Sequence, residues 1–156
     1  MTAASRIAIA TAGTSVTRNK DALVMSVSAL PVTSGFFQLD FTPRWSTNAG
    51  ATLIDTRDGA GNNGVAMYVQ SDTLVFINGA GSFAQSPAQV WVPNQTYRLR
   101  AIFRNTTIAI SRNDIEIGGN AAATMPTGHT AFRLGDGFAA SSPLDGWIRN
   151  FSSGRL

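Results

Sequence analysis

The strongest constraint on the fold is the alternation of apolar and polar residues with period two over short runs. Phe37, Leu39 and Phe41 alternate with polar residues up to Pro43, and residues 97–104 repeat the pattern most clearly. Successive side chains of a β-strand point to opposite faces, so each run predicts a strand with one buried face. No segment of helical length keeps apolar residues at i, i+3, i+4 and i+7. The chain is therefore predicted to be nearly all β.

Further short runs predict strands, and residues typical of turns separate them. The other predicted strands are Ala22–Val27, Ala51–Thr56, Val65–Gln70, Thr73–Ile77, Thr107–Ser111, Ala131–Leu134 and Trp147–Phe151. Turn signals such as Asn78-Gly79 lie between them and favour hairpins. A single sheet of this kind would leave one apolar face in water, so we predict an all-β, two-sheet antiparallel β-sandwich of the jelly-roll type. Alternation with Phe151 places Trp147 in its core.

The length of 156 residues fits one compact domain preceded by a short arm. Residues 1–20 are rich in Ala, Thr and Ser, with few large apolar side chains. We predict an N-terminal arm over 1–20 and a sandwich domain over 21–156. The arm either pairs along the edge of the sandwich or is held by a neighbouring chain, which Arg6, Ile7 and Ile9 would then bind. The apolar stretch near the N-terminus is too short for the apolar region of a signal peptide. No apolar run in the sequence approaches the roughly 20 residues of a membrane-spanning helix.

Arginine dominates the positive charge. The net charge is +3, and eleven of the twelve cationic residues are arginines scattered along the chain. Without a basic run, direct nucleic-acid binding is disfavoured. Arg98, Arg100 and Arg104 share one face of their predicted strand. That face is either solvated or an interface that meets carboxylates of a partner.

Residues suited to catalysis are scarce, and we predict that the protein is not an enzyme. It has nine acidic residues, one histidine and no cysteine. Asp114 and Glu116 have the i, i+2 spacing that could bring two carboxyl groups together, but they flank a turn and are interpreted as solvated. The single histidine, His129, lies in a loop and is interpreted as a surface or packing residue.

One tryptophan and one loop are candidates for binding a sugar. Trp45 follows Pro43 at a strand end and is predicted to be the most exposed of the three tryptophans. Candidate polar contacts in the loop after residue 54 are Asp55, Asp58, Asn62 and Asn63. Their oxygens suit Ca²⁺, but the spacing matches no EF-hand and a plain turn selects the same residues. No cofactor is predicted, and calcium is left as the alternative.

Two groups of segments carry a family resemblance. Residues 97–103, 105–111 and 114–118 resemble the central hairpin of concanavalin A-like lectin/glucanase domains, including the laminin G-like branch. Residues 132–135 and 144–151 resemble their closing strands. The resemblance implies a concanavalin A-like jelly roll. Glucanase members carry a glutamate-rich catalytic strand that this sequence lacks, so it does not imply hydrolysis.

Residues 17–24 look like the lead-in of lectin-like modules in tailed-bacteriophage virion proteins. This resemblance implies a non-enzymatic virion structural protein, either a capsid decoration (cement) protein or a fibre-type surface protein. It would be assembled in the host cytoplasm and would dock on other virion proteins, including further copies of itself. The alternative is a carbohydrate-binding module of a tail fibre or secreted protein that recognises host glycans.

Overall fold

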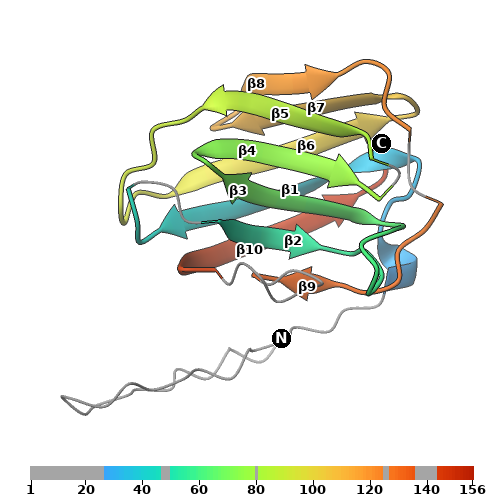
Figure 1. The fold of residues 1–156 in the computed structure, drawn as a ribbon, viewed down its shortest axis with the longest axis horizontal. Coiled ribbons are helices and arrows are strands. Elements are labelled where there is room, and N and C mark those ends of the chain that lie inside the picture. Colours follow the sequence, from blue (N-terminus) through green and yellow to red (C-terminus); the bar gives the residue numbers. More distant parts are fainter. Residues whose placement is uncertain (1–26, 47–49, 80, 125–126, 136–143) are drawn as a thin grey trace, which may run out of the picture.

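The computed structural model describes residues 27–46, 50–79, 81–124, 127–135 and 144–156 (Figure 1). The predicted arm, with Arg6, Ile7 and Ile9, lies outside the described residues, as does nearly all of the predicted strand over 22–27. Val27 begins a short 3-10 helix, η1 (Val27–Ala29). No helix in the described ranges is long and apolar enough to span a membrane.

The described chain forms two five-stranded sheets in which every paired strand is antiparallel. Sheet A has the order β10-β1-β6-β7-β8, and sheet B has the order β5-β4-β3-β2-β9 (Figure 1). The strands are β1 (Ser34–Pro43), β2 (Ala51–Asp55), β3 (Val65–Gln70), β4 (Thr73–Asn78), β5 (Phe83–Ala88), β6 (Tyr97–Arg104), β7 (Thr107–Arg112), β8 (Ile115–Asn120), β9 (Arg133–Leu134) and β10 (Gly146–Gly154). The predicted all-β jelly-roll sandwich is confirmed.

The core lies between the two sheets and follows the predicted alternation. Phe37, Leu39 and Phe41 of β1 are fully buried, and the residues between them are half-buried. These three side chains pack beside the inward side chains of β6, in the same sheet, and against those of β3 and β4 in the opposite sheet. Aromatic rings fill the centre: Phe103 lies 5.8 Å from Phe37 and 6.1 Å from Phe76 between ring centroids. Such close packing of apolar groups is the main source of stability in a chain without disulfides.

The edge strands β5 and β8, one from each sheet, lie side by side and close one side of the sandwich (Figure 1). The Asn120 side-chain amide donates a hydrogen bond of 2.8 Å to the Phe83 carbonyl. A Cβ atom on Gly118 would lie 2.3 Å from the Gln85 carbonyl oxygen, so only glycine allows this approach. The contact covers two strand edges that would otherwise be free to pair with other chains.

Trp147 lies on the outer face of sheet A, with 45% of its surface exposed, so its predicted core position is wrong. The cause is a β-bulge in β10. Asp40 pairs with Arg149 while Gln38 pairs with Ser152, so two residues of β10 oppose one of β1. Asn150 takes a φ of 50° at this bulge. The extra residue reverses the alternation, so that Ile148 and Phe151 both pack against the core and Trp147 points outward.

Candidate functional site

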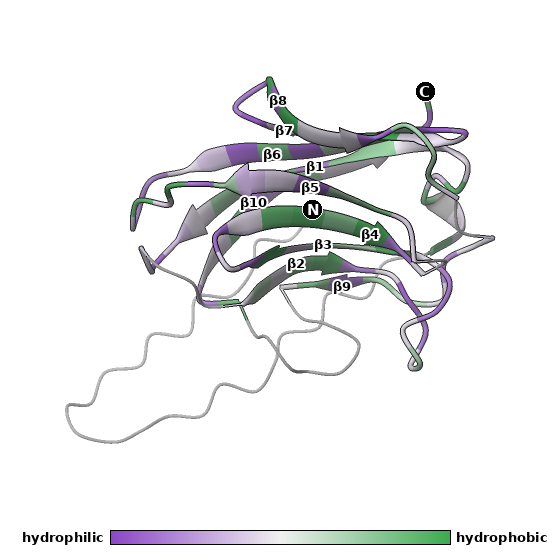
Figure 2. Ribbon diagram, turned by 45° about the horizontal axis from the view of Figure 1, so that its top comes forward, coloured by the Kyte–Doolittle hydropathy of each residue, from purple (hydrophilic) through white to green (hydrophobic). Residues whose placement is uncertain are grey.

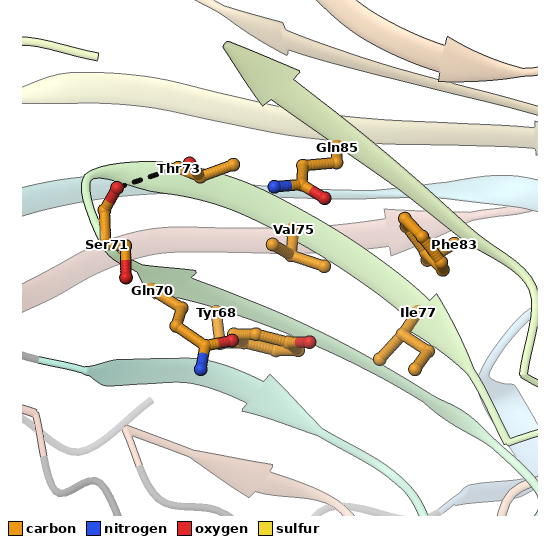
Figure 3. A pocket seen from close by; sticks show the side chains of 8 residues that line it. All are labelled: Tyr68, Gln70, Ser71, Thr73, Val75, Ile77, Phe83 and Gln85. Atoms are coloured by element: carbon orange, nitrogen blue, oxygen red, sulfur yellow. Dashed lines mark hydrogen bonds between the residues drawn. The ribbon is translucent and has the colours of Figure 1, made fainter. Parts of the chain in front are cut away.

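The outer face of sheet B carries a shallow groove over strands β3, β4 and β5 (Figure 3). Its volume of about 330 Å³ is at the low end of the range for small-molecule sites. The residues that line it are Tyr68, Gln70, Ser71, Thr73, Val75, Ile77, Phe83 and Gln85. All eight come from three adjacent antiparallel strands and the turn between β3 and β4.

The strand register arranges the lining residues in rows across the sheet. Val75 of β4 pairs with Tyr68 on one side and with Gln85 on the other. Ile77 pairs with Phe83 in the next row. Figure 3 shows these side chains on the same side of the strands, with Val75 between Tyr68 and Gln85. The groove therefore has an aliphatic floor with an aromatic ring on each side strand.

Strand β4 is apolar on both faces, unlike a strand with one face in water. Leu74 and Phe76 point into the core, while Val75 and Ile77 point outward into the groove. Figure 2 shows β4 as hydrophobic along most of its length, whereas β6 alternates between hydrophobic and hydrophilic residues. At the groove edge, Phe83 has 48% of its surface exposed. An apolar floor beside an exposed aromatic ring is typical of a surface that contacts a ligand.

The polar end of the groove lies at the two-residue turn between β3 and β4. Ser71 and Asp72 both have positive φ, which matches the twist of a tight hairpin. The Asp72 carbonyl accepts hydrogen bonds from the Trp91 indole, at 3.0 Å, and from the Gln89 backbone, at 2.9 Å. These bonds fix the turn, so the groove is formed by rigid parts of the chain.

A bulge in β5 shapes the other side of the groove. The Leu74 backbone N–H donates to the Ser86 hydroxyl at 3.0 Å, and this hydroxyl donates to the Pro87 carbonyl at 2.7 Å. The Ser86 side chain thus replaces a partner in the backbone ladder, and the register shifts between Thr73 and Val75. Gln85 stays directed to the outer face, where it can bond a ligand.

The Tyr68 phenol lines the groove in its protonated form. Burial raises the pKa of Tyr68, and the positive charge of Arg57 opposes this effect more weakly. The hydroxyl can therefore both donate and accept hydrogen bonds at neutral pH. Arg57 itself forms a two-point ion pair with the fully buried Asp55, at 2.8 Å and 3.2 Å.

The predicted sugar-binding residues lie away from this groove and do not form one site. Trp45 follows the end of β1, whereas the loop begins after the end of β2, and these two ends lie on opposite sides of the sandwich (Figure 1). Trp45 is half-buried against Phe41 and Trp91, with ring centroids 6.0 Å and 6.2 Å away. Trp147 is more exposed than Trp45, so the prediction that Trp45 is the most exposed of the three tryptophans is wrong. The surroundings of Trp45 are those of a packing residue.

The loop residues have structural partners, and one prediction among them needs correction. Asp55 is fully buried in its ion pair with Arg57, so it cannot contact a sugar. Asp58 accepts hydrogen bonds from the backbone of Ala60 and Asn62 at 3.0 Å and 2.8 Å, which closes the turn. The amide oxygen of Asn63 accepts a bond of 2.9 Å from Thr127. Sugar contact by the exposed Asn62 and Asn63 stays a prediction.

These carboxylates are not arranged to hold calcium together. Within the described ranges, no three His, Cys, Asp or Glu side chains gather in the way a metal site requires. Asp55 and Asp58 direct their oxygens to Arg57 and to backbone N–H groups of the turn. The donor set therefore does not fit the six to eight oxygen ligands of Ca²⁺.

The three arginines of β6 lie together on the outer face of sheet A, as the alternation predicts. Arg98 is 3.8 Å from Asp40 and 3.4 Å from Asp114. The Arg100 guanidinium lies over the Phe36 ring, 4.8 Å from its centroid, and Arg104 is exposed. A role for these residues in binding a partner stays a prediction.

The residues considered for catalysis are separate from the groove. Asp114 and Glu116 are exposed at the β8 edge of sheet A, where they line a different hollow together with Arg100 of β6. His129 is part-buried: its Nε2 donates to the Pro31 carbonyl and its Nδ1 is hydrogen-bonded to the Thr56 hydroxyl, both at 2.8 Å. Burial lowers the pKa of His129, and the bond to Pro31 opposes this effect. The ring connects its loop to the segment before β1 and is a packing residue.

Comparison with known proteins identifies the fold. The sequence matches no protein-family model, and no curated protein is significantly similar to it. Among solved structures, the Ruminococcus gnavus IT-sialidase CBM40 bound to α2,3-sialyllactose aligns with 80% of this chain and 77% of its own, at a TM-score of 0.64 and 15% identity. The fold is a lectin-like jelly roll.

Two further structures agree. Domains LG4-5 of the mouse laminin α1 chain align with 86% of this chain and 38% of their own, at a TM-score of 0.67 and 13% identity. Sheep galectin-11, solved in complex with glycerol, aligns with 87% of this chain and 99% of its own, at a TM-score of 0.57 and 13% identity. The likeness confirms the concanavalin A-like, laminin G-like fold and does not test the virion context.

Proposed function

We propose that the protein binds carbohydrate in the groove on the outer face of sheet B. The observation that carries the proposal is the combination of two aromatic rings, Tyr68 and Phe83, with the side chains of Gln70, Thr73 and Gln85 in one groove. A sugar ring has an apolar C–H face that packs on aromatic rings and a rim of hydroxyls that bond to amides and hydroxyls. The groove offers both kinds of contact.

The groove is also suited to binding because its backbone is already ordered. Its lining residues come from paired strands and from a turn that the Trp91 indole anchors. A preformed site does not pay for ordering its own backbone when the ligand binds.

The solved structures support carbohydrate binding over the virion role. The CBM40 neighbour is bound to a sialylated sugar, and a second neighbour is the carbohydrate-binding module CBM66 from Bacillus subtilis, with a TM-score of 0.53 and 17% identity. The fold class thus favours a non-enzymatic binding domain. A place for the protein in a tail fibre or in another virion assembly stays a prediction.

The test is binding of the full chain to a glycan array, followed by calorimetry with the tightest ligand. Tyr68→Ala and Phe83→Ala should each weaken binding roughly tenfold, since each removes a stacking surface. Trp147→Ala is the matched control, because it removes an exposed aromatic from the opposite face. If the Tyr68 and Phe83 variants bind the glycan as tightly as the unsubstituted protein does, with the fold intact by circular dichroism, the proposal is contradicted.

Docking on neighbouring subunits is kept as a second proposal, since one face of the sandwich is suited to it. The outer face of sheet A presents Arg98, Arg100 and Arg104 together with the exposed Trp147, and arginine and tryptophan are enriched in interfaces. Light scattering of the full chain, beside an Arg100→Glu/Trp147→Ala variant, tests self-association through this face. An assembly that the variant reduces to monomers supports it, and equal masses for both proteins contradict it.

A further inference from the structure

We infer that the groove on sheet B takes neutral glycans and excludes sialylated or sulfated ones. This inference rests on the proposed function and adds the chemical class of the sugar. Its first support is the lining itself, which consists of aromatic, aliphatic, hydroxyl and amide side chains. In the described part of the chain, no Asp, Glu, Lys, Arg or His contributes to that lining.

The cation that acts on Tyr68 is already paired. Arg57 acts electrostatically on the Tyr68 phenol, so its positive charge is close to the groove. Both its Nη2 and its Nε bond to the two oxygens of Asp55, and the Asp55 side chain is fully buried. A two-point pair of this kind uses the geometry by which arginine would hold the carboxylate or sulfate of a ligand. The Arg57 donors are therefore directed at Asp55 and not into the groove, and its charge affects the Tyr68 pKa less than burial does.

At the polar end of the groove, the turn carries a negative charge. Asp72 lies in the turn between Ser71 and Thr73, and both of these neighbours line the groove. One carboxylate oxygen of Asp72 is buried, with no hydrogen-bond partner among the described residues. A sugar carboxylate placed at this end would meet a like charge and would lose its own water shell. Sugar hydroxyls carry no charge and lose far less on transfer.

The amide groups favour the same class of ligand. Gln85 is exposed on β5 and Gln70 is exposed on β3, on the two sides of the β4 floor. Each amide offers donors and an acceptor, and so matches hydroxyls, which also do both. An anionic group accepts hydrogen bonds only, so it could use the N–H donors of these glutamines but would give their amide oxygens no donor.

The experiment compares matched glycans. The full chain is applied to an array that holds neutral oligosaccharides, including lactose and N-acetyllactosamine oligomers, beside their α2,3-sialylated and sulfated counterparts. We expect the neutral member of a bound pair to bind at least about tenfold more tightly than its anionic counterpart. Binding should also change less than about twofold between 50 and 500 mM salt, since no charge pair forms.

A charge-introducing variant sharpens the test. Gln85→Arg places an unpaired cation at the groove. It should reduce the ratio of the affinity for the neutral glycan to the affinity for its anionic counterpart roughly tenfold. Gln38→Arg, which places the same charge on the outer face of sheet A, is the control and should leave the ratio unchanged.

The outcomes separate the inference from the proposed function. Preference for sialylated or sulfated members, with binding lost in Tyr68→Ala, would overturn the neutral class and leave glycan binding by the groove intact. Absence of binding to every member of the array, or binding that Tyr68→Ala leaves unchanged, would overturn the groove as a glycan site and the inference with it.

Discussion

The outer faces of the two sheets differ in chemistry, although each is built from antiparallel strands over the same core. On sheet A, strand β6 buries Tyr97, Leu99, Ala101 and Phe103, and its outer face carries three arginines, at 98, 100 and 104, with a single large apolar residue, Ile102, among them. On sheet B, strand β4 keeps Val75 and Ile77 on its outer side as well. A sheet face that contacts only water does not need two large apolar side chains on one strand. The contrast supports the proposal that the outer face of sheet B contacts a carbohydrate.

The two faces also differ in their ion pairs, and this gives the largest expected effect. Arg57→Met would leave the fully buried Asp55 without its cation and should lower the free energy of unfolding by about 3–5 kcal/mol. Arg98→Met, which breaks the exposed pairs with Asp40 and Asp114, should cost less than about 1 kcal/mol. Urea denaturation measures both. Similar losses in the two variants would show that the pair beside the groove is no more important than a surface pair.

The two sides of β4 provide the next comparison. Leu74→Ala removes a fully buried side chain from between the sheets and should cost about 2–5 kcal/mol of unfolding free energy. Ile77→Ala removes a half-buried side chain from the groove floor and should cost about 1 kcal/mol. The second variant should instead weaken glycan binding. Chemical denaturation and calorimetry together separate the two effects, and a stability loss in Ile77→Ala as large as in Leu74→Ala would contradict the assignment of faces.

A smaller effect concerns pH. The folded protein lowers the pKa of His129 through burial, so the unfolded chain binds a proton more readily than the folded one. This contribution to stability is fully present above pH 6.5, the ordinary value, and is lost as the pH falls from there through the folded pKa. Thermal unfolding between pH 4.5 and 8 should show this loss, and His129→Gln should reduce it. An unchanged pH dependence in His129→Gln would exclude this ring as the cause. Groove affinity, which involves no histidine, should follow pH only through unfolding.

The sequence was sufficient for the fold class because alternation and turns are local signals. The strands around Phe37 and over 97–104 could be placed from period two alone. Strand β5 was missed because Ser86 and Pro87 interrupt it, and Ser86 replaces a backbone partner with its hydroxyl. Trp147 was misplaced because a bulge at Asn150 is not visible in the pattern of residues.

The candidate site depends on register, and the sequence alone does not supply register. Tyr68, Val75 and Gln85 come from three strands and meet only because of how these strands pair. One local signal was present: the run Leu74–Ile77 is apolar without alternation, which indicates a strand covered on both faces. The predicted loop site was drawn instead from residues that are favoured in turns, and Asp58 does form such a turn.

The most direct test of the difference between the two faces is chemical-shift mapping on the ¹⁵N-labelled full chain. The chain is titrated with the tightest neutral glycan found on the array. The account predicts shifts concentrated at the backbone of β3, β4 and β5 around Tyr68, Val75 and Gln85, with the strands of sheet A unaffected. Shifts concentrated on the outer face of sheet A, or at the loop over 58–63, would contradict it.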